Sequence, residues 1–106
     1  MTKVLFLPEV VEQFLELAEV LYSKGYLGFK DIAVEYAEQL FKDIQLTLPL
    51  KVKKNAPSHF ERYGAGLLYS SFPKNHHTTW YVFFSVIGET YWIKYIANNH
   101  VVSQYL

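Results

Sequence analysis

The sequence predicts an α+β domain of two layers, in which a helical hairpin packs on one face of a sheet that is mostly antiparallel. Three observations lead to this prediction. The chain has 106 residues and 51% of them are hydrophobic, which suits a single domain with one core over residues 1–106. Apolar residues in the first half recur at helical spacing, whereas those after Arg62 alternate as in strands. Helices and strands that segregate along a chain in this way are typical of α+β domains.

One short strand and two helices are predicted in the first half of the chain. The strand covers residues 3–7, and Pro8 suits the first turn of a helix, where its missing N–H costs nothing. This helix is expected to end at Gly25, because glycine is common at the C-terminal cap of helices. A second helix is expected over residues 29–46, and the short link between the two predicts an antiparallel hairpin.

Three strands are predicted in the second half, after a loop with three lysines over residues 49–61. They cover residues 63–72, 78–86 and 90–97, so the order of elements is β-α-α-β-β-β. Residues 78–86 are apolar at both alternating sets of positions, which predicts a central strand that is covered on both faces. In the last strand, strict alternation predicts one shared face for Tyr91, Ile93, Tyr95 and Ala97.

Positive and negative charges balance over the whole chain but not within its halves. The net charge is zero, which argues against strong non-specific binding of nucleic acid. Residues 1–50 carry 8 acids and 4 lysines, whereas residues 51–106 carry 2 acids and 6 cations. The chain is therefore expected to present either one acidic and one basic face or an ordinary solvated surface.

The absence of cysteine and the residues of the N-terminus indicate in which cellular compartment the protein is expected. No cysteine is present, which excludes disulfides, thiolate zinc sites and cysteine nucleophiles. The apolar run before Pro8 is too short for a signal peptide, and no stretch is long enough to span a membrane. We therefore expect a cytoplasmic protein with no membrane contact, and nothing in the sequence implies a cofactor or a metal ion.

Three segments of the second half are similar to a known family: FERYG at 60–64, TTWYVFF at 78–84 and YIANNH at 95–100. With these segments and the order of its elements, the chain resembles the RelE/ParE superfamily of bacterial toxins, also known as plasmid stabilisation proteins, over nearly its whole length. The resemblance implies the toxin of a type II toxin–antitoxin system, which a cognate antitoxin holds inactive. RelE-like members cleave mRNA at the ribosome without a metal ion, whereas ParE-like members inhibit DNA gyrase.

Metal-free cleavage of RNA needs three kinds of group. A base takes the proton of the ribose 2′-hydroxyl, cations stabilise the charge of the phosphorane, and an acid protonates the leaving 5′ oxygen. RelE-like enzymes carry these groups on the exposed face of the sheet and in the C-terminal tail. The resemblance therefore implies the catalytic candidates His100, Tyr105 and Arg62. The substrate-binding candidates are Lys53, Lys54, Lys74, His76, His77, Asn98 and Asn99.

Each candidate also has a purely structural interpretation. The Asn-Asn-His segment could simply end a strand, and Tyr105 could pack on the sheet. Arg62 could pair with Glu61 or with an acidic face of a helix. The cations that RelE-like enzymes carry on their second and third strands are absent from residues 67–71 and 78–80. Three functions therefore stay open: an mRNA endoribonuclease, a ParE-like inhibitor of DNA gyrase, and a non-toxic family member that only binds a partner protein.

Aromatic residues make up 18% of the chain, and two helices can cover only one face of its sheet. Aromatic side chains on the other face are therefore expected to form an exposed apolar patch. Such patches usually mark binding sites, so we expect an antitoxin or a second copy of the chain to cover this face.

Overall fold

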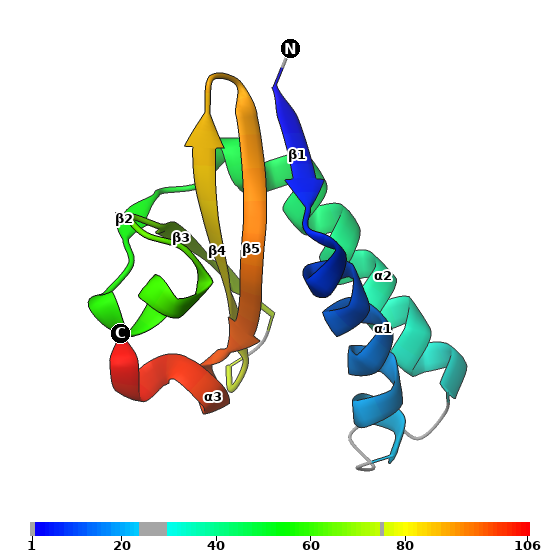
Figure 1. Cartoon of the computed structure of the whole chain (residues 1–106). Helices are drawn as coiled ribbons and strands as arrows, with labels where there is room; N and C mark the ends of the chain where they lie inside the picture. The colour runs from blue at the N-terminus through cyan, green and yellow to red at the C-terminus, as the bar shows by residue number, and fades with distance from the viewer. Residues whose placement is uncertain (1, 24–29, 75) are drawn as a thin grey trace.

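Two helices pack against one face of a five-stranded sheet, which confirms the predicted fold class (Figure 1). The computed structural model describes residues 2–23, 30–74 and 76–106. Its larger elements are β1 (Lys3–Phe6), α1 (Pro8–Ser23), α2 (Lys30–Thr47), β3 (Leu68–Pro73), β4 (Thr79–Ile87) and β5 (Thr90–Asn98). Its smaller elements, in which η denotes a 3-10 helix, are η1 (Leu48–Leu50), β2 (Lys54–Asn55), η2 (Ser58–Tyr63), α3 (Asn99–Val102) and η3 (Ser103–Tyr105).

The first helix begins where the sequence predicts. α1 starts at Pro8, and the carbonyl of Leu7 accepts a hydrogen bond from the N–H of Val11 at 3.0 Å. The predicted helix end at Gly25 and the predicted helix start at residue 29 lie outside the described residues. Within the described ranges, no helix has the length and the apolar character needed to cross a membrane.

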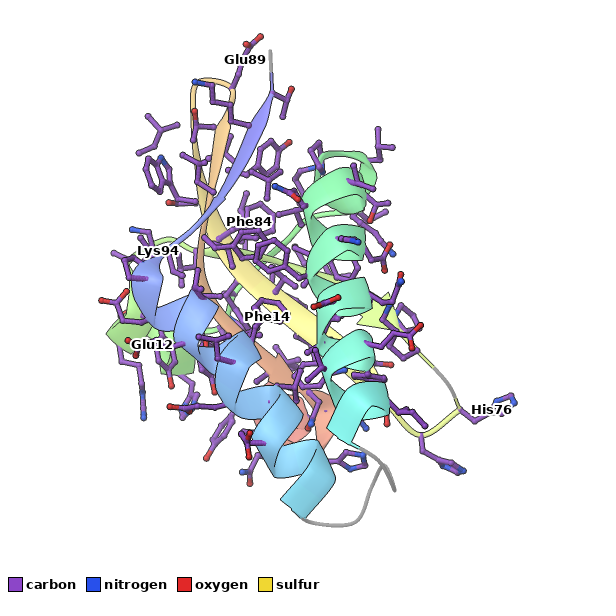
Figure 2. All side chains as sticks on the ribbon, turned by 90° about the vertical axis from the view of Figure 1, so that its right-hand side faces the viewer. Glu12, Phe14, His76, Phe84, Glu89 and Lys94 are labelled. Atoms are coloured by element: carbon purple, nitrogen blue, oxygen red, sulfur yellow. The ribbon has the colours of Figure 1, made fainter. Side chains whose placement is uncertain are left out.

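The main core lies between the helical hairpin and the sheet. Its buried residues come from both layers and include Val10, Phe14, Leu40, Ile44, Phe84 and Ile93. Figure 2 shows Phe14 and Phe84 between the helices and the sheet. The ring of Phe6 in β1 stacks on Phe41 of α2, with 4.2 Å between their centroids. The hairpin is therefore held to the sheet by aromatic packing.

The sheet has the strand order β1-β5-β4-β3-β2, so β4 is its central strand as predicted. β1 runs parallel to β5, and the other neighbours are antiparallel. Because β1 has four residues, it pairs only with residues 90–93 of β5. The N–H of Leu7 then donates to the carbonyl of Ile93 at 3.1 Å, and the chain turns into α1. The second half of β5 is therefore flanked on this side by a helix and not by a strand.

A bulge in β5 changes which of its residues share a face. Two successive residues of β4 lie opposite Ile93 and Tyr95, so Lys94 is an extra residue in the ladder. As a result, Ile93 and Ile96 both contact the core under the hairpin, whereas Tyr95 and Ala97 contact the core on the other face. The predicted single face for every second residue of this strand is therefore wrong.

The face of the sheet opposite the hairpin is covered by the chain itself. η2 and the segment formed by α3 and η3 lie on that side of the sheet in Figure 1. Phe83 is fully buried there, and its ring stacks on Phe60 with 4.2 Å between centroids. This second core consists of Phe60, Leu67, Phe83, Ala97 and Val102. The predicted exposed aromatic patch is therefore wrong, because η2 and the C-terminal segment bury Phe83 and leave Tyr69, Tyr81 and Tyr95 only half-exposed.

The connection between α2 and β3 contains more structure than the predicted loop at 49–61. It forms η1, β2 and η2 in succession. The strand predicted at 63–72 begins later, at Leu68. The strand starts later because of the backbone conformation before it. Gly64 and Gly66 have φ angles of 155° and 65°, which favour glycine and do not occur in a regular strand.

Candidate functional site

Two asparagines fix the start of the tail, residues 99–106, to the sheet. The side-chain oxygen of Asn98 accepts a hydrogen bond from the backbone N–H of His100 at 2.9 Å and so caps α3. The side chain of Asn99 accepts from the N–H of Thr79 at 2.9 Å and donates to the carbonyl of His77 at 3.1 Å. Both asparagines therefore have a structural role: Asn98 joins the end of β5 to the first turn of α3, and Asn99 joins the tail to β4 and to the turn before it.

The imidazole of His100 points away from the sheet. Val102, two positions later in α3, is 2% exposed and belongs to the second core. Side chains of residues two positions apart in an α-helix point in directions that differ by about 200° around the helix axis. His100 therefore lies on the opposite side of α3 from Val102, where its side chain is exposed. It is accessible to a molecule that lies against the outer side of the tail.

Tyr105 packs on η2 and not beside His100. Its ring stacks on His59 with 3.5 Å between centroids and 6° between planes. It also meets the ring of Phe60 edge-on at 6.3 Å. Tyr105 keeps 40% of its surface exposed. The stack fastens the end of the tail to η2, across the second face of the sheet.

The 3-10 spacing of η2 decides which of its side chains reach the sheet. Side chains three residues apart are eclipsed in a 3-10 helix. Phe60 and Tyr63 therefore share one side, which faces the sheet, and Tyr63 stacks on Tyr95 of β5 at 3.9 Å. His59 and Arg62 share the next side. Arg62 is thus placed at the C-terminal end of η2, close to the bulge in β5.

Arg62 lines a hollow together with the bulge residue. This basic hollow has a volume of about 420 Å³ and is lined by Leu7, Glu9, Gln13, Arg62, Tyr63, Lys94 and Tyr95. Figure 2 shows Lys94 beside the start of α1. A β-carbon added at Gly64 would lie 3.4 Å from Cδ of Lys94, so the aliphatic chain of this lysine runs against Gly64. The bulge and the tight turn after η2 therefore bring Arg62 and Lys94 to one place.

A second hollow continues along β5 toward the tail. Its volume is about 230 Å³, and Gln13 and Tyr95 line both hollows. Its far end is lined by Asn98 and Val101, the residues on either side of Asn99 and His100. The side chain of Gln13 donates to the carbonyl of Ile96 at 3.2 Å and lies where the two hollows meet. We call the two hollows together the β5 groove.

Tyr95 is a hydrogen-bond donor in this groove at neutral pH. Burial, together with the interaction with the hydroxyl of Tyr63, raises the pKa of Tyr95 to about 12. The positive charge of Arg62 acts on this pKa in the opposite direction. The phenol therefore keeps its proton and can donate it to an oxygen atom of a bound molecule.

We expect the protein to lose stability between about pH 10 and about pH 12 in part through Tyr95. A tyrosine in the unfolded chain ionises near pH 10, whereas Tyr95 in the folded chain ionises near pH 12. The unfolded state loses its proton first and is therefore favoured as the pH rises. The thermal unfolding midpoint of Tyr95→Phe should consequently fall less over this interval than that of the wild type. An equal fall in both proteins would contradict the raised pKa.

Two of the predicted substrate-binding lysines are engaged within the chain. Nζ of Lys53 donates to the carbonyls of Pro49 and Lys51 at 3.1 and 3.0 Å. Nζ of Lys74 lies 3.2 Å from a carboxylate oxygen of Asp43 in α2. Lys54 of β2, by contrast, is exposed.

The predicted histidine turn lies beside the tail and away from Arg62. His76 and His77 are exposed, and Figure 2 shows His76 directed away from the sheet. The carbonyl of His77 is held by Asn99, so this turn adjoins the start of α3. Apart from the three lysines, the structure thus divides the predicted site residues into three places: Arg62 at the basic hollow, Tyr105 on η2, and the asparagines and histidines at the end of β5.

Four residues near these places were not predicted from the sequence. Lys94 reaches the basic hollow because of the bulge, which leaves no pattern in the sequence. Tyr63 and His59 could have been found from their three-residue spacing to Phe60 and Arg62, had a 3-10 helix been expected. Tyr95 was assigned to a face with Ile93, from which the bulge separates it.

The chain was compared with protein-family models, with curated proteins and with solved structures, and none of them matches. Among residues 2–23, 30–74 and 76–106, no three His, Cys, Asp or Glu side chains are placed to hold a metal ion together. The function of the chain is therefore inferred from the geometry of the β5 groove and from the resemblance in its sequence.

Proposed function

We propose that the chain is the toxin of a type II toxin–antitoxin system and that it cleaves mRNA at the ribosome, in the bacterial cytoplasm, without a metal ion. This is the RelE-like function that the sequence resemblance implies, and a cognate antitoxin holds the toxin inactive. The RNA strand lies along the β5 groove, from the basic hollow to the start of the tail.

One observation carries this proposal: the groove has Arg62 and Lys94 at one end and Asn98, two residues before His100, at the other. Tyr95 lies between the two ends, and Tyr63 stacks on it. Cations that follow a strand together with aromatic rings are typical of grooves that bind single-stranded nucleic acid. Glu9 and Glu16 also line the groove, so positive charge is in excess only at the basic hollow, and it is this hollow that supports an RNA substrate for a chain of zero net charge.

We assign the proton transfers of cleavage to His100, which follows the end of the groove, and the contacts to the phosphate to Tyr95 and Asn98 in its lining. The imidazole of His100 takes the proton of the ribose 2′-hydroxyl, and the 2′ oxygen attacks the neighbouring phosphorus. The phenol of Tyr95 and the side-chain amide of Asn98 donate to the phosphate oxygens as their negative charge increases. The bond to the 5′ oxygen breaks, and the imidazolium of His100 returns the proton to that oxygen. The products are a 2′,3′-cyclic phosphate and a free 5′-hydroxyl.

Tyr105 has a supporting role in this proposal. Its stack on His59 fastens the tail at its far end, while Asn99 fastens it at the start. With both ends held, α3 keeps His100 beside the end of the groove. Tyr105 therefore acts on the reaction by positioning the tail.

Expression of the wild-type chain in a bacterial host is expected to stop growth and to cut mRNA. Purified protein, ribosomes and mRNA in the presence of EDTA should yield fragments that end in 2′,3′-cyclic phosphate. Expression of His100→Gln should leave growth and mRNA intact. Arrested cells with uncut mRNA would contradict the proposal.

Two other outcomes would identify the alternative functions. Growth arrest with DNA damage, intact mRNA and undiminished toxicity of His100→Gln would indicate a ParE-like inhibitor of DNA gyrase. Normal growth on expression of the wild type, at a protein level verified by immunoblot, would indicate a family member that only binds a partner.

A further inference from the structure

We propose that the basic hollow binds a backbone phosphate of the RNA strand other than the one cleaved beside His100, and that Lys94 is a positioning residue for that strand. This inference rests on the proposed function, since it takes RNA as the substrate. Arg62 and Lys94 together hold this phosphate. Arg62 thereby has a binding role in place of the catalytic role that the resemblance implies.

Two like charges converge in the hollow without compensation by an ion pair. Arg62 comes from η2 and Lys94 from the bulge of β5, and both line the same hollow. Neither forms an ion pair with another residue of the part of the chain that the structure describes. Glu9 is the one acidic residue in the lining, so the two cations leave the hollow with a net positive charge. An anion that accepts from both cations would relieve their repulsion, and a phosphate suits the forked donors of arginine.

The geometry of β5 separates this phosphate from the cleaved one. Lys94 and Asn98 are four residues apart, which corresponds to about 13 Å along a strand. A phosphate held between Arg62 and Lys94 in the basic hollow lies at the end of the groove away from Asn98. The two ends of the groove are therefore suited to different phosphates of the same strand.

The shape of the hollow favours a strand over a free phosphate ion. Its volume of about 420 Å³ is much larger than one phosphate, and it continues into the second hollow past Gln13 and Tyr95. Leu7 and Tyr63 add apolar surface to its lining, which suits a ribose or a base next to the phosphate.

The test measures binding of a non-cleavable RNA as a function of salt. A labelled 2′-O-methyl oligoribonucleotide of about eight nucleotides is titrated by fluorescence anisotropy with the wild type and with Lys94→Gln. We expect Lys94→Gln to weaken binding about tenfold. The slope of log K against log salt should also become smaller by about 0.7, the contribution of one phosphate contact on a single strand.

Matched variants separate a local effect from a loss of overall charge. Lys42→Gln removes the same charge from the exposed side of α2, on the other layer, and should leave both the affinity and the slope unchanged. Lys94→Arg keeps the charge and should restore binding. On ribosome-bound mRNA, Lys94→Gln should raise KM about tenfold and change kcat by less than about twofold, as expected for a residue that acts only in binding.

The measured slopes and rates distinguish failure of the phosphate site from failure of the proposed function. A slope for Lys94→Gln equal to that of the wild type or of Lys42→Gln would overturn the inference, as would a lower kcat with unchanged affinity. If the wild type does not cleave RNA but Lys94→Gln still lowers the slope, the proposed function fails while the phosphate site stands. If the wild type cleaves RNA and Lys94→Gln changes nothing, only the inference fails.

Discussion

Replacing His100 with glutamine is expected to reduce mRNA cleavage by about 10²- to 10⁴-fold, the usual effect of removing a general acid–base group. The fold should be unaffected, because the side chain of His100 is exposed and the backbone N–H bound by Asn98 is retained. The measurement is kcat/KM on ribosome-bound mRNA, together with the thermal unfolding midpoint of each protein. Lost activity at an unchanged midpoint would assign the effect to chemistry.

His59 provides the matched control for this experiment. It is the imidazole that stacks on Tyr105, at the other end of the tail. His59→Gln should keep at least about a tenth of the wild-type kcat/KM, since it changes only the fastening of the tail. An inactive His59→Gln with an active His100→Gln would move the proton transfer to the stack of His59 and Tyr105 and contradict the assignment to His100.

Phe83→Ala is expected to lower the free energy of unfolding by about 3–5 kcal/mol, as much as truncation of a ring in the core under the hairpin. Phe83 is fully buried and packs against Phe60, Tyr69 and Tyr95 on the second face of the sheet. Removal of its ring leaves a cavity between the sheet and η2 that the β-sheet backbone cannot close. Urea unfolding monitored by circular dichroism provides the measurement.

Two reference variants, one buried and one exposed, provide the scale for the effect of Phe83→Ala. Phe84→Ala truncates the neighbouring residue, which is fully buried on the hairpin side, and should cost a similar free energy. Leu50→Ala truncates a side chain that is 85% exposed and should change the free energy of unfolding by less than about 0.5 kcal/mol. A cost below about 1 kcal/mol for Phe83→Ala would show that η2 and the tail do not form a core with the sheet.

The order and type of the large elements followed from the sequence because they depend on local patterns. The start of α1 at Pro8 and the central position of β4 were both predicted correctly. Periodicity and proline act over a few residues, so no distant contact is needed to interpret them. The short elements η1, β2 and η2 were missed because they are set by packing on the sheet and have no periodicity of their own.

The candidate site was only partly predictable for the same reason. Arg62 was identified as a cation of interest, but its partner Lys94 was not, because a bulge in β5 brings the two together. Lys53 and Lys74 were predicted to bind substrate, and the structure instead gives them partners within the chain. Whether a lysine is available to a ligand depends on acceptors that come from distant segments.

The sequence by itself determined the α+β class, the helical hairpin and the central apolar strand, since each follows from the spacing of apolar residues along the chain. Only the tertiary structure decided which side chains share the β5 groove. One extra residue in the β5 ladder moves Tyr95 to the face that η2 covers. A register shift of this kind arises from pairing between strands, and no property of the single strand encodes it.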